Sequence, residues 1–313
     1  MSLLPLFSLL VLVVVAVGTT AVVARRPFQA HAATVADAVR HSRRISAAAL
    51  LIGGVAAVAA GYAAELPAIT GESVNARNGV AAISIPLAFG LAHTGALLVG
   101  ELTWPKPAGD LRRARLERRG LLDSVPRWLL RLAQGALVTG LVVVVAGALV
   151  ARPDGRTVTV TAGGGAVQGA AAPFAGTDYG LPTAAGLVFL AALTGYALWV
   201  VSGRAALGTA DDEAERVLRR ASAHRVLRGA TTAASVTVGG LLAVSSMSLR
   251  NAATGAIDTA RANDLPVDRL TSALPQLGAV LALVGLVGAL VGVGVLAVRA
   301  PRPAAEPLAP VGA

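Results

Sequence analysis

The sequence predicts an all-α fold, a polytopic transmembrane bundle of seven helices with its N-terminus outside and its C-terminus cytoplasmic. Three observations lead to this fold class. Of the 313 residues, 55% are hydrophobic and 14% are charged, whereas a soluble domain carries about 25% charged residues. Seven stretches are long and apolar enough to cross a bilayer. Basic residues, finally, concentrate in every second connecting segment.

The seven apolar stretches each approach the length of about 20 residues that a spanning helix needs. They are 3–24, 45–64, 80–101, 128–150, 182–201, 230–249 and 275–298. The first could be taken for a signal peptide, but Arg25 and Arg26 follow its apolar run instead of preceding it, so we expect a retained span. Residues 1–300 would then form a single transmembrane domain, and 301–313 a short disordered cytoplasmic tail.

The orientation follows from the basic residues. Of 27 lysines and arginines, the segments placed outside hold only Arg77, Arg152, Arg156, Arg250, Arg261 and Arg269. Such an excess of basic residues in alternate loops is the positive-inside pattern. The formal charge of +10 is therefore a topology signal, and nucleic acid is excluded as a partner. The cytoplasmic arginine clusters are expected to meet anionic lipid headgroups, or else to be solvated loops that only set the topology.

Aromatic residues fall at the ends of the predicted spans, where amphipathic rings prefer the headgroup level. At the cytoplasmic ends these interface anchors are Trp104, Trp128 and Trp199, and at the outer ends they are Tyr62 and Tyr179. Their positions agree with the same seven-span model.

The chain also suggests a threefold repeat of an inward span, a basic segment and an outward span, over 1–64, 80–150 and 182–249. The alternative is that Ala/Arg/Val-rich sequence aligns with itself by chance. The basic segments are expected to be short helices. In the third, Glu215 and Arg219 stand at i,i+4 and can pair on the helix surface.

One ionisable residue lies well inside a predicted span, where such groups are costly. It is His93, in the third span, and Pro86 stands two helical turns before it on the same face and should kink the helix. Glu101 closes the span two turns after His93 but is rotated by roughly 80°. These three residues form the candidate intramembrane polar site, a proton or metal site in one interpretation. In the other, His93 is a neutral side chain that hydrogen-bonds a neighbouring helix.

No cofactor, metal site or catalytic constellation is predicted. The remaining histidines, His31, His41 and His224, belong to cytoplasmic segments, and there is no cysteine. A retinal protein needs an intramembrane lysine, but the only lysine, Lys106, lies in a cytoplasmic loop. The sequence therefore indicates a protein that is not an enzyme.

The longest outer loops, 151–181 and 250–274, are candidate surfaces for a ligand, or ordinary connectors. Within the first, the run 163–165 is expected to be a flexible linker. Small residues at small-xxx-small spacing, as in Gly53, Ala57 and Gly61 or in Gly288 and Gly292, should serve packing inside the bundle.

Two segments carry a resemblance. Residues 179–182, with the sequence Tyr-Gly-Leu-Pro, and 218–225, Leu-Arg-Arg-Ala-Ser-Ala-His-Arg, resemble segments of multi-spanning membrane proteins of GC-rich, actinobacterial type. The resemblance implies a bacterial plasma membrane and no transferable activity.

The sequence thus predicts an integral plasma-membrane protein acting as a non-enzymatic accessory or structural partner of another membrane protein. One alternative is a small-molecule or ion transporter that uses the kinked third helix around His93. Another is a receptor that senses ligands through loops 151–181 and 250–274.

Overall fold

The computed structural model describes residues 35–69, 74–104, 120, 122–204 and 212–301. The described part folds into six α-helices and one β-hairpin. In chain order these are α2 (Val35–Ile69), α3 (Val74–Leu102), α4 (Arg127–Val150), β1 (Val158–Ala162), a 3₁₀ turn η1 (Gly163–Gly165), β2 (Val167–Ala171), α5 (Thr177–Gly203), α6 (Asp212–Ala262) and α7 (Arg269–Ala297). The first predicted span, 3–24, and the predicted tail after residue 301 lie outside the described residues.

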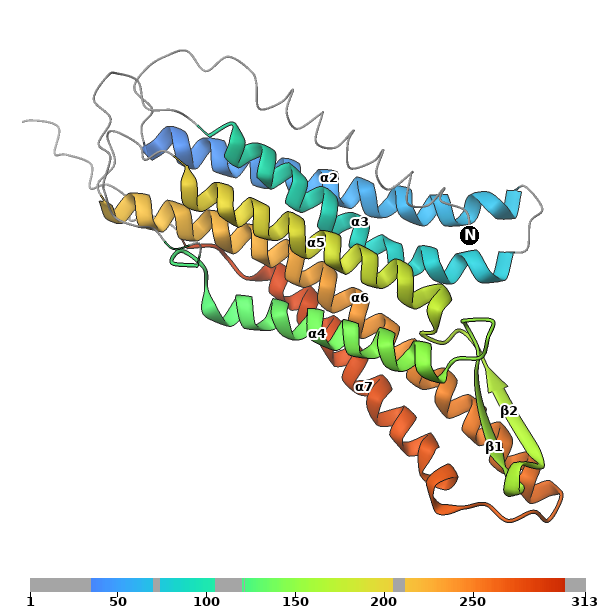
Figure 1. Cartoon of the computed structure of the whole chain (residues 1–313). Helices are drawn as coiled ribbons and strands as arrows, with labels where there is room; N and C mark the ends of the chain where they lie inside the picture. The colour runs from blue at the N-terminus through green and yellow to red at the C-terminus, as the bar shows by residue number, and fades with distance from the viewer. Residues whose placement is uncertain (1–34, 70–73, 105–119, 121, 205–211, 302–313) are drawn as a thin grey trace, which may run out of the picture.

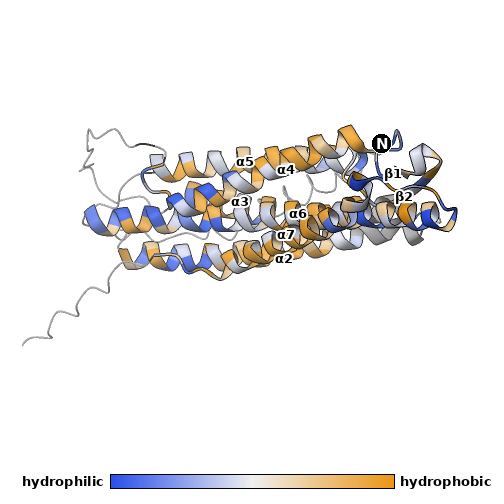
Figure 2. Ribbon diagram, turned by 90° about the horizontal axis from the view of Figure 1, so that it is seen from below, coloured by the Kyte–Doolittle hydropathy of each residue, from blue (hydrophilic) through white to orange (hydrophobic). Residues whose placement is uncertain are grey.

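All six helices in the described residues are long and apolar enough to cross a membrane. They run side by side, and their ends collect at two opposite ends of the bundle (Figure 1). At one end of the bundle α2, α4 and α6 begin. The helices α3, α5 and α7 run in the opposite direction and finish at that same end (Figure 1). Hydrophilic residues gather toward both ends, with apolar residues between them (Figure 2). The mainly helical fold and six of the seven apolar spans are therefore as the sequence predicted.

α3 and α6 form the centre of the bundle. About 61% of the most apolar window of each helix is buried, against 17% for both α4 and α7. α2 packs mainly on α3, while α4 and α7 pack on α6. The apolar side chains that α7 leaves exposed, among them Leu283 and Leu290, form an outward surface suited to lipid tails.

The prediction of short cytoplasmic helices followed by separate spans was wrong for α6. This helix is continuous over 51 residues, about 76 Å at 1.5 Å per residue, and far exceeds the bilayer core of about 30 Å. It joins the predicted basic segment, the span and part of the outer loop 250–274 without a break, because no Pro or Gly-rich stretch interrupts it. α2 likewise includes residues 35–44, which the sequence assigned to a separate segment.

The loop 151–181 contains structure that the predicted fold class omitted. β1 and β2 pair antiparallel, with Val160 opposite Gly169, and pack against the far end of α6. The run 163–165 is the tight connection of this hairpin and not a linker: its three glycines have φ of 62°, 65° and 94°, which side chains rarely tolerate. Gly169 also has to be small, because a Cβ there would lie 2.0 Å from the Ala252 carbonyl oxygen.

Two exposed aspartates fix the turns at this end of the bundle. Asp268 caps α7 by accepting a hydrogen bond from the Thr271 amide at 2.8 Å, and that bond lowers its pKa from the usual value. Asp154 accepts from the hydroxyl and amide of Thr157. The hydroxyl bond is the main cause of the lowered pKa of Asp154.

α6 and α7 approach each other through glycines. A Cβ on Gly239 would lie 2.4 Å from the Gly285 carbonyl oxygen, and one on Gly285 would lie 2.6 Å from that of Gly239. Gly278 and Gly292 continue this contact at a spacing of seven residues, the repeat of a left-handed helix pair. Gly288, expected to pack with Gly292, lies on another side of α7, and a Cβ there would have no neighbour within 4 Å among the described residues.

Candidate functional site

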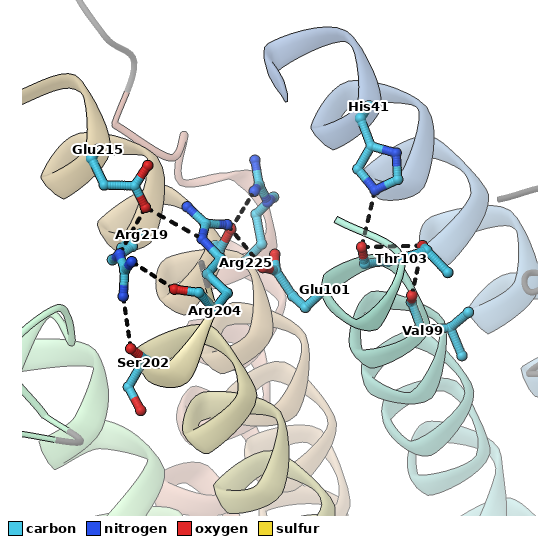
Figure 3. A network of polar contacts seen from close by, with 11 residues as sticks. His41, Val99, Glu101, Thr103, Ser202, Arg204, Glu215, Arg219 and Arg225 are labelled. Carbon is cyan, nitrogen blue, oxygen red and sulfur yellow. Dashed lines mark hydrogen bonds and ion pairs between the residues drawn. The ribbon is translucent and has the colours of Figure 1, made fainter. Parts of the chain in front are cut away.

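The described charged residues that are buried meet at one end of the bundle, where α3 and α5 end and α6 begins (Figure 3). We name this group the Arg204 cluster. Its buried charged members are Glu101 from α3, Arg204 after α5, and Glu215 and Arg219 from α6. The Ser222 hydroxyl and the half-buried Arg225, both from α6, complete it. The three helices are thus joined by side chains, and not only by apolar packing.

The contact between Glu101 and Arg204 joins α3 to α5. Nη1 of Arg204 donates to Oε2 of Glu101 at 2.9 Å, and both side chains are below 10% exposed. The same Nη1 also donates to the Ser222 hydroxyl at 3.2 Å. A buried charge pair of this kind needs both partners, since a charge left alone in the interior is strongly destabilising.

Glu215 and Arg219 form the second pair, within α6. Nε of Arg219 donates to Oε1 of Glu215 at 2.8 Å, and Arg204 approaches the same oxygen at 3.7 Å. Arg219 further donates to the carbonyl oxygens of Ser202 and Arg204 at 2.7 and 2.8 Å. The predicted i,i+4 pair exists, but it is buried and holds the end of α5, whereas we expected it on the helix surface.

Trp104 belongs to the surroundings of this cluster. The guanidinium carbon of Arg204 lies 3.7 Å from the Trp104 ring centroid, a cation–π contact. The ring of His41 meets Trp104 edge-on at 5.8 Å, and His41 Nε2 lies 2.9 Å from the Gly100 carbonyl oxygen. α2 is thereby attached to the same end of the bundle.

His93 lies between three helices, nearer the middle of the bundle. It is 1% exposed and stacks on Phe89 at 5.4 Å. A Cβ on Gly229 of α6 would lie 2.1 Å from His93 Nδ1, and a Cβ on Gly53 of α2 would meet the His93 Cβ at 3.2 Å. Within the described residues, His93 Nδ1 has no hydrogen-bond partner, so this nitrogen does not supply the hydrogen bond that we expected from His93 to a neighbouring helix.

The other two candidate site residues are also placed. Glu101 contacts Arg204 and not His93, in agreement with the rotation around α3 that the sequence implied. Pro86 lies inside α3, which continues as a helix on both sides of it. The three residues thus belong to one helix but do not form one site.

The interface anchors divide into two groups. Trp128, Trp199 and Tyr62 are 48%, 61% and 71% exposed, and their placement at headgroup level stays a prediction. Trp104 and Tyr179 are only 7% and 5% exposed. Trp104 packs under Arg204, and Tyr179 packs in a cluster with Val144 and Ala175, so these two rings contact protein, and their role at headgroup level stays a prediction.

Sequence reasoning missed most of the Arg204 cluster, because it treated the arginines as solvated loop charges. One signal was available: Glu101 at the end of a central span would need a cationic partner if it were buried. Nothing in the spacing of the chain indicates that the partner is Arg204.

The cluster has the chemistry of a structural ion network. It contains no Ser or Cys nucleophile beside a base, and the described residues hold no group of three side chains suited to a metal ion. The chain matches no protein-family model, no curated protein and no solved structure. The fold and the site therefore define a class only, a helical bundle with six apolar candidate spans.

Proposed function

We propose that the protein is a non-enzymatic integral protein of the bacterial plasma membrane that acts as an accessory or structural partner of another membrane protein. One observation carries the proposal: the buried carboxylates and arginines of the described interior pair with one another and join helices. Glu101 is bound to Arg204, and His93 is enclosed by Gly53 and Gly229. A transport relay needs ionisable groups that are free to exchange protons or ions. Groups that are paired like Glu101 or enclosed like His93 favour a rigid scaffold instead.

The orientation proposed for this scaffold places the Arg204 cluster on the cytoplasmic side. The described arginines are more numerous at that end, including Arg216, Arg220 and Arg299, than at the hairpin end. This distribution supports the positive-inside arrangement, with the β-hairpin outside.

The partner role is tested by quantitative proteomics of membranes from a strain that lacks the protein. We expect at least one other integral membrane protein to fall several-fold in abundance. Complementation with the wild type or with His93→Leu should restore it equally, since the imidazole has no chemical role in a scaffold. Unchanged membrane proteins in the deletion strain would contradict the proposal.

A second candidate function is transport, favoured by the buried Nδ1 of His93 that lacks a hydrogen-bond partner in the described part of the chain. Proteoliposomes loaded with a pH-sensitive dye test proton flux directly. Flux above that of protein-free vesicles, lost in a correctly folded His93→Leu variant, would favour the transporter over the accessory protein.

A receptor is the third candidate, favoured by the continuity of α6. One helix connects the surface on which the hairpin packs, around Ala252, with Glu215 and Arg219 in the Arg204 cluster. Ligand-dependent protection of residues 151–181 from proteolysis would support it.

A further inference from the structure

Arg225 of the Arg204 cluster and its neighbour Arg228 form no ion pair with a carboxylate within the described residues. Arg204 forms an ion pair with Glu101, and Arg219 forms one with Glu215. The two that remain are Arg225 and Arg228, and both are half-buried. They stand at i,i+3 on α6 and so share one face of the helix.

The positive charge of this region is concentrated. Nη1 of Arg204 and Nη2 of Arg225 both donate to the Ser222 hydroxyl oxygen, at 3.2 and 3.0 Å. Arg228 also lies within electrostatic range of Arg225. Glu101 attracts Arg225 as well, but the four arginines Arg204, Arg219, Arg225 and Arg228 outnumber the two buried carboxylates, Glu101 and Glu215. A net positive charge therefore remains in a region of low dielectric, where like charges repel each other strongly.

Several hydrogen-bond donors in this region are unused. Nη2 of Arg204 and Nε of Arg228 are buried without an acceptor in the described part of the chain. The Ser222 oxygen accepts two bonds, and its own proton has no acceptor among the residues described. Guanidinium and hydroxyl donors are the groups that match the oxygens of a phosphate group.

The depth of the group fits a lipid headgroup. Two other members of the Arg204 cluster, Glu101 and Arg204, lie at the C-terminal ends of the apolar spans of α3 and α5. At this level a phospholipid carries its phosphate, and basic residues beside it attract anionic lipids. Arg228 additionally donates to the Val298 carbonyl oxygen at 3.0 Å, which holds it beside the end of α7.

We propose that Arg225, Arg228 and the Ser222 hydroxyl form a binding site for a phosphate group, supplied by an anionic phospholipid or by free phosphate. The site is independent of the proposed accessory role. It assigns a specific position on α6, where the sequence indicated only a general attraction between arginine clusters and headgroups.

The test uses delipidated full-length protein in a neutral detergent, titrated with phosphatidylglycerol, phosphatidylcholine or inorganic phosphate. Binding is followed by the ³¹P NMR signal and by the rise in unfolding temperature. We expect saturable binding of phosphatidylglycerol but not of phosphatidylcholine. Arg225→Gln should weaken it at least about tenfold, as expected from the loss of a charge-assisted hydrogen bond.

Arg216→Gln is the matched control, because Arg216 lies on the same helix, is 63% exposed and pairs with Glu213. It should bind like the wild type. Saturable binding of inorganic phosphate as well would identify a site for the free anion, and binding of phosphatidylglycerol alone would identify a headgroup site. Equal affinities in Arg225→Gln and the wild type, equal losses in both variants, or no saturable binding of either probe would overturn the proposal.

Discussion

His93 and Gly229 show at the scale of single residues how a polar side chain is accommodated in this bundle. The imidazole fits because α6 has no side chain at the position it faces. Glycine costs a helix about 1 kcal/mol relative to alanine, and the close approach of α3 and α6 offsets that cost.

Gly229→Ala should therefore destabilise the protein by about 1–3 kcal/mol, the usual cost of overpacking, because the new Cβ would lie 2.1 Å from His93 Nδ1. SDS-induced unfolding followed by circular dichroism measures the loss. Gly240→Ala, on the same helix with no atom near its Cβ among the described residues, is the control and should be neutral or stabilising. Equal losses in the two variants would contradict the packing described for His93.

Glu101→Ala should destabilise the protein by about 3–5 kcal/mol, because it leaves Arg204 without its closest carboxylate in a buried position. The exposed pair of Glu213 and Arg216 provides the comparison, and Glu213→Ala should cost less than about 1 kcal/mol. In a double-mutant cycle, adding Arg204→Ala to Glu101→Ala should cost little more. Additive losses would show that the two side chains do not act as a pair.

Among the elements, α6 organises the molecule, since it contacts α3, α4, α5, α7 and the hairpin. Its contact with α7 depends on backbone approach at Gly239 and Gly285. In a membrane this contact has no hydrophobic driving force, so close packing decides its strength.

Gly285→Ala should weaken this helix pair, since its Cβ would lie 2.6 Å from a carbonyl oxygen that cannot rotate away. We expect a loss of about 1–3 kcal/mol in the same unfolding assay. Gly288→Ala, one turn further along α7 with open space around it in the described part of the chain, should leave stability unchanged or raised. The account of the α6–α7 contact fails if Gly288→Ala is the more damaging change.

At the scale of the whole molecule, hydropathy predicted all six α-helices of the described residues, since bilayer thickness sets the length of an apolar run. It did not predict that α6 extends beyond the span, because extramembrane helix has no apolar signature. The sequence signal for the hairpin was only the alternation of Thr and Val over residues 157–161. Arg204 could not be assigned a partner, since the pairing depends on how α3, α5 and α6 pack, and its position in the chain resembles that of any loop arginine.

The central claim is a bundle that crosses the membrane with the Arg204 cluster inside and the hairpin outside. The chain contains no cysteine, so single cysteines can be introduced without background. Thr161→Cys in the hairpin and Glu213→Cys at the start of α6 place one thiol at each end, both at exposed positions. With a membrane-impermeant maleimide on intact cells, we predict labelling of Thr161→Cys at once and of Glu213→Cys only after permeabilisation. Labelling of both from the same side would contradict the account.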